Sequence, residues 1–255
     1  MPKGLRWLDA RTADVGGVQF LVTAVESEYR DEVSNGERFV MVKDAAYVKR
    51  CVDRFIELRP RNIAEMGIYQ GGSTVFWNLV LEPERHLAFD LDDRSVEPLD
   101  GFASSGAKHG RLDIRYGVDQ SDADAVTAAA QETFGNEPID LVIDDASHFY
   151  PESRATFESL FPRLRPGAIY VIEYWAWAHW PTSPLVQEYL GRDRPALTNL
   201  VVELMLVCGS RSGIVDELVV EPHAVHVTRG AKPLESPFRL ADEYSNRGMP
   251  YRPLL

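Results

Sequence analysis

The sequence NIAEMGIYQGGST, residues 62–74, joins an apolar run to a helical pattern through a turn that is rich in glycine. Residues 62–66 are typical of a buried strand, and residues 71–81 carry apolar side chains at helical spacing. Gly67 allows the backbone to turn sharply and to come close to a ligand. Gly71 removes a side chain where the helix begins and leaves N–H groups free for an anion. The stretch therefore predicts a strand, an anion-binding turn and a helix.

The chain around this stretch alternates apolar runs with helical patterns, which is typical of a parallel sheet covered by helices on both faces. The predicted strands are residues 62–66, 86–90, 112–116, 139–144 and 168–173, and the predicted helices are residues 44–58, 71–81, 121–134, 152–164 and one or two helices within 184–208. Residues 213–220 and 224–229 flank a short connection and predict an antiparallel hairpin. We expect an α/β fold with a Rossmann-like, doubly wound, mostly parallel seven-stranded sheet that ends in this C-terminal hairpin.

The two ends of the chain differ from this pattern. Residues 18–33 carry apolar positions at mixed three- and four-residue spacing and predict a helix, so we interpret residues 1–43 as an N-terminal helical cap. Residues 44–230 then form the α/β domain. Residues 231–255, rich in Pro, Arg and Tyr, predict an extended C-terminal tail. The cap and the tail are compatible with a homodimer, although no interface can be read from the sequence.

The composition excludes several classes of function. The chain has 39 acidic and 27 basic residues and a net charge of -12, without a Lys/Arg-rich stretch, which disfavours nucleic acid as a partner. Cys51 and Cys208 are too few for a disulfide framework and favour a reducing compartment. We find neither a signal-peptide pattern nor an apolar run of about 18 residues, so the sequence predicts a cytoplasmic protein without a membrane partner.

The glycine turn has the spacing Glu65-x-Gly67-x-x-x-Gly71, which resembles the first motif of class I methyltransferases. In that motif the loop holds the amino-acid end of S-adenosylmethionine. Tyr69 stands where the dinucleotide fingerprint needs its second glycine, and its bulk disfavours NAD. Asp90 ends the next predicted strand, where a carboxylate can accept hydrogen bonds from ribose hydroxyls. The predicted cofactor-binding residues are Glu65, Gly67, Gly71, Ser73 as a helix cap, Asp90, Asp119, Gln120 and Asp144, with a plain helix start as the alternative for the segment around Asp119.

The fourth predicted strand ends in two adjacent carboxylates and a histidine, IDLVIDDASHFY. Asp144 and Asp145 point to opposite sides of the strand, while the turn from Asp145 to His148 can aim both ends at one point. An imidazole can take the proton of an alcohol at neutral pH, so we expect His148 to act as a general base. Glu173, at the end of the fifth strand, and Asp145 offer two carboxylates to a divalent cation, with a hydrogen-bonded cap as the alternative for Glu173.

Aromatic residues follow this cluster in YWAWAHW, residues 174–180. Tyr174, Trp175 and His179 are candidates for a wall that stacks on sugar rings, and packing within the protein is the alternative. Tyr47, on the helix before the first strand, is a further substrate candidate. Its helical spacing also fits a ring in the core.

Residues 139–173, together with IAEMGIYQGGST and GVDQSD, resemble the sugar O-methyltransferases of macrolide tailoring and their relatives in cephalosporin biosynthesis. The resemblance covers residues 40–175. It implies transfer of a methyl group from S-adenosylmethionine to a sugar or oligosaccharide hydroxyl, with His148 as base and Mg²⁺ at Asp145 and Glu173. The family has a second acid where this chain has Tyr174, which moves that ligand to Asp144 or water. The pattern also resembles the mycobacterial enzymes that methylate the 1-OH of methylmannose oligosaccharides.

Two other functions stay open at this point. A nicotinamide-dependent Rossmann oxidoreductase would use the same sheet, but Tyr69 disfavours it. A non-catalytic, methyltransferase-like binding subunit would keep the fold, but it would have no use for the carboxylates and His148 at the end of the fourth strand.

Overall fold

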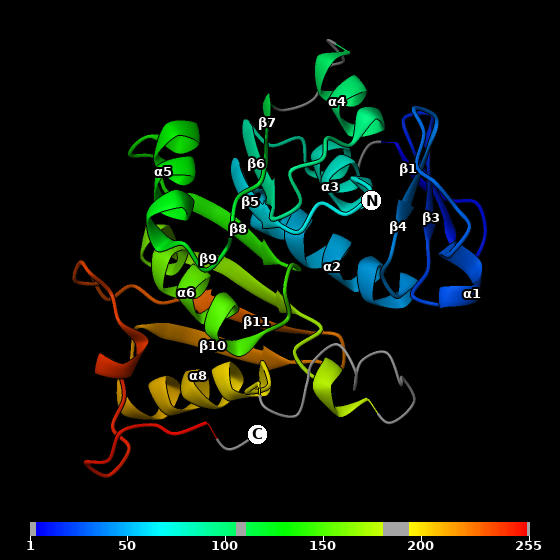
Figure 1. The fold of residues 1–255 in the computed structure, drawn as a ribbon. Coiled ribbons are helices and arrows are strands. Elements are labelled where there is room, and N and C mark those ends of the chain that lie inside the picture. The colour runs from blue at the N-terminus through cyan, green and yellow to red at the C-terminus, as the bar shows by residue number, and fades with distance from the viewer. Residues whose placement is uncertain (1–3, 106–110, 181–193, 254–255) are drawn as a thin grey trace. The chain divides into compact units, whose positions relative to one another are not determined.

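A computed structural model describes residues 4–105, 111–180 and 194–253. The chain divides into two compact units, residues 1–118 and 119–255. Figure 1 shows that each unit combines strands with helices that pack beside them.

The first unit begins with a four-stranded sheet in the order β1-β2-β3-β4. Its elements are β1 (Leu5–Trp7), β2 (Thr12–Val15), β3 (Val18–Val22), the short helix α1 (Glu26–Tyr29) and β4 (Arg38–Met41). The strands β1, β2 and β3 pair antiparallel, and β4 pairs parallel with β3. We call these four strands the N-terminal sheet.

The predicted helix over residues 18–33, and with it the helical character of the cap, is wrong. Val15 pairs with Val18 across a two-residue turn in which Gly16 and Gly17 have φ values of 62° and 96°. A Gly-Gly pair between apolar residues is a hairpin signal, because both turn residues must adopt positive φ. That signal outweighs the loose helical spacing, and only Glu26–Tyr29 is helical.

The remainder of the first unit carries the predicted strand-turn-helix. Its elements are α2 (Ala45–Leu58), β5 (Asn62–Met66), α3 (Gly72–Leu81), β6 (Arg85–Asp90), α4 (Glu97–Ser104) and β7 (Arg111–Tyr116). The strands β5, β6 and β7 are parallel, so the ends of β5 and β6 lie at one edge. Helix α4 lies in a stretch where the sequence pattern predicts no element.

The second unit carries the other strands and helices. Its elements are α5 (Ala123–Phe134), β8 (Ile139–Asp144), α6 (Tyr150–Leu160), η1 (Phe161–Arg163), β9 (Leu164–Glu173), η2 (Trp177–His179), α8 (Thr198–Ser210), β10 (Val215–Val220), β11 (Ala224–Arg229) and η3 (Leu240–Asp242). The strand order of the larger sheet is β10-β11-β9-β8-β5-β6-β7. Strands β8 and β9 are parallel, and β11 pairs antiparallel with both β9 and β10. The predicted seven-stranded, mostly parallel sheet with a C-terminal hairpin is confirmed.

The boundaries differ in places from the sequence pattern. Helix α6 ends at Leu160, and the chain enters β9 at Leu164 through a short 3-10 turn that contains Pro162. The first part of the predicted helices within 184–208 falls on residues 181–193, outside the described residues. In the described part of the tail, residues 231–253, η3 is the only regular element.

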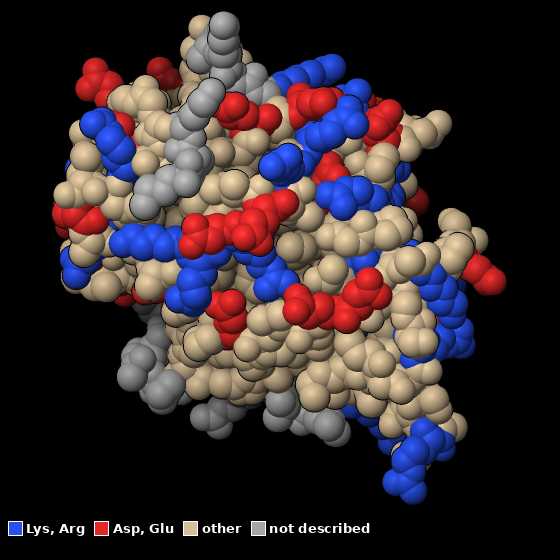
Figure 2. Space-filling view, turned by 180° about the vertical axis from the view of Figure 1, so that it is seen from behind, with Lys and Arg blue, Asp and Glu red and all other residues tan. Residues whose placement is uncertain are grey.

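Charged side chains of both signs are intermingled on the face that Figure 2 shows. Exposed charged side chains of the protein form ion pairs, such as the one between Arg61 Nε and Glu84 Oε1 at 2.7 Å. Within the described ranges, every helix is too short or too polar to cross a bilayer.

The N-terminal sheet packs closely against α3. The ring of Phe20 on β3 meets Phe76 on α3 edge to face at 5.2 Å between centroids. Strand β4 comes still closer, because a Cβ atom added at Gly72 would lie 2.0 Å from the carbonyl oxygen of Val40. Gly72 is therefore needed for the backbone of β4 to touch the first turn of α3.

We expect Gly72→Ala to lower the free energy of unfolding by about 1–3 kcal/mol or more, because its methyl group overlaps the rigid Val40 carbonyl. Gly101→Ala on α4 is the matched control, since its new Cβ would meet open space and helix propensity favours alanine by about 1 kcal/mol. Urea unfolding followed by far-UV circular dichroism measures both. Equal stabilities of the two variants would contradict the close approach.

Candidate active site

The glycine turn at the end of β5 is built from left-handed backbone. Gly67 and Gly71 have φ values of 94° and 78°, and Tyr69 adopts 49° although it is not a glycine. The Gly71 N–H donates to the Ile68 carbonyl at 2.8 Å, which closes the turn on itself. Positive φ is costly for a tyrosine, so the surrounding contacts must hold the turn in place.

Asp90 provides one of these contacts. Its Oδ2 atom accepts hydrogen bonds from the N–H groups of Ile68 at 2.7 Å and Tyr69 at 3.2 Å, and its Oδ1 atom accepts from the N–H of Asp92 at 2.9 Å. The structure thus brings Asp90 and the glycine turn together. A carboxylate has about four lone-pair positions, so Asp90 keeps capacity for another donor.

Glu65 lies beneath the turn and is fully buried. It accepts a hydrogen bond from the Ser73 hydroxyl, and its Oε2 atom lies 3.4 Å from Nε2 of the buried His86. Burial alone would raise the pKa of Glu65, but His86, Ser73 and the positive charge of Lys43 together lower it. Glu65 is therefore held as a carboxylate inside the unit, where it supports the turn from below.

Two predictions for the first unit need correction. Ser73 does not cap α3: the N-cap position is Gly71, without a side-chain bond, and the Ser73 hydroxyl is bound to Glu65. Tyr47 is 2% exposed and lies in the core, so the packing alternative holds. His86 was not among the predicted site residues; its signal in the sequence is a histidine inside an apolar strand, where it pairs with Ile63 of β5.

Gln120 and Asp144, predicted to contact the cofactor, bond to each other inside the second unit. The Gln120 amide donates from Nε2 to Asp144 Oδ1 and to Thr156 Oγ1, both at 3.2 Å, and its Oε1 accepts from the Ser147 N–H at 2.8 Å. Both side chains are buried, so the structure gives them an internal role. Asp119 is exposed and accepts hydrogen bonds from the N–H and hydroxyl of Ser121.

Asp145 and His148 lie together after β8. Asp145 Oδ1 is 3.8 Å from His148 Nε2, and both side chains are 17% exposed. His148 has a φ of 58°, a left-handed conformation that is strained for a residue other than glycine. Such backbone strain is common at functional sites. Its ring meets Tyr174 and Trp177 edge to face at 5.3 and 5.2 Å between centroids. Glu173, 2% exposed, is the last residue of β9.

The aromatic segment after β9 divides into two groups. Tyr174 and Trp177 contact the His148 ring, whereas Trp175 donates from Nε1 to the Glu221 carbonyl at 2.8 Å. His179 Nε2 bonds to Thr198 Oγ1 at 2.7 Å. Trp175 and His179 thus anchor the segment, and Trp177, which the sequence analysis did not single out, lies against the histidine.

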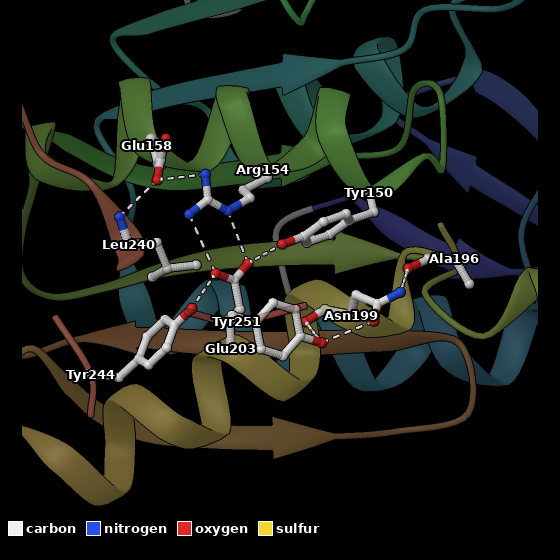
Figure 3. Close-up of polar contacts among 9 residues, drawn as sticks. All are labelled: Tyr150, Arg154, Glu158, Ala196, Asn199, Glu203, Leu240, Tyr244 and Tyr251. Atoms are coloured by element: carbon white, nitrogen blue, oxygen red, sulfur yellow. Dashed lines mark hydrogen bonds and ion pairs between the residues drawn. The ribbon is translucent and has the colours of Figure 1, made fainter. Parts of the chain in front are cut away.

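Helix α6 begins just after His148 and is held by a carboxylate on α8. Figure 3 shows that Glu203 accepts hydrogen bonds from the Tyr150 hydroxyl at 2.7 Å and from Arg154 Nε at 2.9 Å. The Tyr244 hydroxyl of the tail donates to the same carboxylate at 2.8 Å. A buried charge without such partners would be strongly destabilising, so these segments must assemble together.

A second set of contacts in Figure 3 joins the tail to both helices. Glu158 on α6 pairs with Arg154 at 3.0 Å and accepts from the Leu240 N–H at 2.7 Å. The Tyr251 hydroxyl donates to Asn199 Oδ1 on α8 at 2.9 Å. The predicted tail therefore docks on its own unit, and the start of α6 beside His148 is fixed.

No group of three or more His, Cys, Asp or Glu side chains in the described part of the chain is arranged to hold a metal ion. Asp145 and Glu173 nevertheless supply the hard carboxylate oxygens that Mg²⁺ prefers. Because Mg²⁺ commonly keeps several waters and uses one or two protein carboxylates, this donor pair fits its chemistry.

The larger sheet has the strand order of a Rossmann-like methyltransferase fold. Residues 64–173 match a protein family described as a methyltransferase domain. Mycinamicin VI 2''-O-methyltransferase of Micromonospora griseorubida is 36% identical over 167 residues, which cover 61% of this chain and 38% of that protein. Demethylmacrocin O-methyltransferase of Streptomyces fradiae is 35% identical over 126 residues, 47% of this chain and 28% of that protein.

A solved structure agrees with these relatives. The MycE methyltransferase of the mycinamycin biosynthetic pathway, in complex with Mg and SAH, is 25% identical with a TM-score of 0.52, and the match covers 75% of this chain and 50% of that one. The chain thus spans half or less of the length of the proteins named here.

The buried Asp144 predicts a pH dependence of stability. Burial raises its pKa from an ordinary 3.8 to about 6, against the hydrogen bonds from Gln120 and Tyr170 that favour the ionised form. Between about pH 4 and pH 6, Asp144 therefore stays protonated in the folded state, whereas in the unfolded chain it has already lost its proton. This stabilisation is complete below pH 4 and is lost as the pH rises through 6.

We expect Asp144→Asn to remove this dependence. When the pH is raised from 4 to 7.5, the unfolding free energy of the variant minus that of the wild type should increase by about 2–3 kcal/mol. Urea unfolding at both pH values measures it, with exposed Asp124→Asn as the control that follows the wild type. A pH profile of the Asp144 variant identical to that of the wild type would contradict burial of a neutral acid.

Proposed function

We propose that this chain is an S-adenosylmethionine-dependent O-methyltransferase that acts on a hydroxyl of a sugar or oligosaccharide. The observation that carries the proposal is the Asp145–His148 pair at the end of one strand of a methyltransferase fold that also has a glycine turn bound to an acidic residue. Both relatives described above are named O-methyltransferases, and MycE was crystallised with SAH. These likenesses support the proposed reaction over nicotinamide chemistry and over a binding subunit.

The proposed cofactor contacts follow from exposure and bonding. The backbone of the glycine turn would bind the amino-acid end of S-adenosylmethionine, and the Asp90 carboxylate would accept the ribose hydroxyls. Asp119, exposed beyond β7, is the proposed contact for the adenine side. Glu65 and Ser73 bond to each other beside the turn, and Gln120 and Asp144 bond to each other in the second unit, so all four would shape the site around the cofactor.

The proposed reaction moves a methyl group from sulfur to oxygen. His148 takes the proton of the acceptor hydroxyl with the ring nitrogen that does not face Asp145, and the oxygen attacks the methyl carbon in line with the carbon–sulfur bond. The oxygen–carbon bond forms, the carbon–sulfur bond breaks, and S-adenosylhomocysteine leaves. Asp145 orients the imidazole and stabilises its protonated form, a role that carboxylates play beside catalytic histidines.

A divalent cation would assist at the same place. Asp145 and Glu173 would hold Mg²⁺, which supplies positive charge that lowers the pKa of a bound hydroxyl. Tyr174 replaces the second acid of the resembling family, so water would fill that position; Asp144 is committed to Gln120 and Tyr170.

The aromatic rings around His148 support a sugar as the acceptor. Tyr174 and Trp177 present aromatic surface next to the proposed base, which suits the apolar face of a sugar ring. The narrower assignment to the 1-OH of a methylated mannoside stays a prediction from the resemblance. A homodimer and a cytoplasmic location likewise stay predictions from the sequence.

We expect His148→Ala to reduce kcat by about 10²- to 10⁴-fold, the usual contribution of a general base. Affinity for S-adenosylhomocysteine should stay near that of the wild type, because the glycine turn and Asp90 are untouched. Methyl transfer from radiolabelled S-adenosylmethionine to a panel of glycosides, with calorimetric titration of the product, measures both. A variant as active as the wild type would remove His148 from its role.

The metal is tested separately by chelation. Exhaustive EDTA treatment should lower methyl transfer by at least tenfold, because hydroxyl activation by the cation is lost, and added Mg²⁺ should restore it. The Asp145→Asn variant is the matched test, since an amide binds the cation more weakly and should demand more Mg²⁺ for half-maximal activity. Undiminished activity in EDTA would mean that the carboxylates act without a metal.

A further inference from the structure

The side chain of Gln70 joins the glycine turn to a loop far away in the sequence. Its Oε1 atom accepts a hydrogen bond from the Ser34 N–H at 2.7 Å, and its Nε2 atom donates to the Glu32 carbonyl at 3.2 Å. Both ends of the amide therefore bond to backbone groups of residues that lie two positions apart, in the loop between α1 and β4. Neither group belongs to residues 64–173, the stretch that matches the methyltransferase family.

The loop that Gln70 binds is ordered by its own contacts. The Asn35 side chain accepts from the N–H groups of Glu37 and Arg38, both at 2.9 Å. The Ser34 hydroxyl accepts from the Val40 N–H at 3.0 Å and so ties the loop to β4. Gln70 thus bonds to a loop that is already ordered by its own contacts. Its two hydrogen bonds can therefore limit the conformations of the glycine turn.

The side chains next to the two Gln70 hydrogen bonds are exposed. Val33, the residue between the two partners of Gln70, is 75% exposed, and Tyr69 beside Gln70 is 61% exposed. Neither side chain is buried as an anchor would be. The two hydrogen bonds of the Gln70 amide therefore make a direct link between the loop and the turn that these two side chains do not make.

The turn needs a support of this kind. Its backbone passes through left-handed conformations at Gly67, Tyr69 and Gly71, and such a segment keeps one shape only when its surroundings over-determine it. Asp90 supports the side of the turn at Ile68 and Tyr69, but its carboxylate is also the proposed acceptor for the ribose. Gln70 holds the turn without giving up any group to the ligand.

We propose that Gln70 is a positioning residue for the cofactor and that the Glu32–Ser34 loop of the N-terminal sheet is a working part of the cofactor site. The Gln70 amide holds the glycine turn in the shape that receives the amino-acid end of S-adenosylmethionine. Less conformational entropy of the turn is then lost when the ligand binds. This inference rests on the proposed function only for the identity of the ligand.

The test is calorimetric titration of the full chain with S-adenosylhomocysteine, which needs no acceptor. Gln70→Met keeps the length of the side chain and removes both hydrogen bonds, and we expect it to weaken binding about tenfold, equivalent to one or two net hydrogen bonds. Gln70→Glu keeps the oxygen that faces Ser34 and loses only the donor to Glu32. A smaller loss of affinity is expected for it, and it carries the test if Gln70→Met fails to fold.

Asp9→Ala is the matched control. Asp9 Oδ1 also accepts from two backbone N–H groups, those of Arg11 and Thr12, both at 2.7 Å, within the same N-terminal sheet but away from the turn. This variant should bind S-adenosylhomocysteine as the wild type does, even if thermal unfolding shows that it is less stable. That result would separate positioning of the turn from general stability.

Two results would overturn the inference. Wild-type affinity of Gln70→Met would show that the amide does not position the turn, and an equal loss in Asp9→Ala would show that any weakening of the sheet has the same effect. Failure of the wild-type protein itself to bind S-adenosylhomocysteine would instead remove the proposed function, and the positioning role with it. One series of titrations with the wild type, Gln70→Met and Asp9→Ala tells these three outcomes apart.

Discussion

The carboxylate of Asp90 accepts hydrogen bonds from the backbone N–H groups of Ile68 and Tyr69, and this contact ties the glycine turn after β5 to the end of β6. Because the turn runs through positive φ values, it has no regular structure of its own to stabilise it. Its shape is imposed by Asp90 from β6, by Gln70 through the loop before β4, and by the close contact of Gly72 with Val40. Three segments far apart in the sequence therefore define one short piece of backbone.

Buried carboxylates are stabilised in different ways in this protein, and the differences follow from their neighbours. Glu65 has a histidine and a nearby lysine, so its pKa is lowered despite full burial. Asp144 has only neutral donors, from Gln120 and Tyr170, so burial dominates and its pKa rises. Glu203 has a guanidinium and two tyrosine hydroxyls. At Asp144 the neutral donors do not offset the loss of water around the charge, whereas at Glu65 the neighbouring histidine, serine and lysine do.

The catalytic candidate His148 depends on similar support. Its backbone is left-handed, and the residues on either side are tied down: the Ser147 N–H donates to Gln120, and Phe149 bridges to Ala196. Tyr150 then fixes the start of α6 through Glu203. The geometry that places an imidazole beside Asp145 is thus an outcome of packing in the second unit, where α6, α8 and the tail meet.

The sequence by itself determined the strand-turn-helix at residues 62–81, the positions of the parallel strands along the chain and the hairpin, because apolar periodicity and glycine positions act on the local backbone. It also placed Asp90 beside the glycine turn and Asp145 beside His148, since the ends of parallel strands and a short turn leave little choice. It did not determine the partners of these side chains inside the protein: Ser73 bonds to Glu65, Gln120 bonds to Asp144, and Tyr47 is buried in the core. Only the tertiary structure decided that, and revealed Gln70, because the partner of a polar side chain is supplied by residues distant in sequence and no local pattern encodes it.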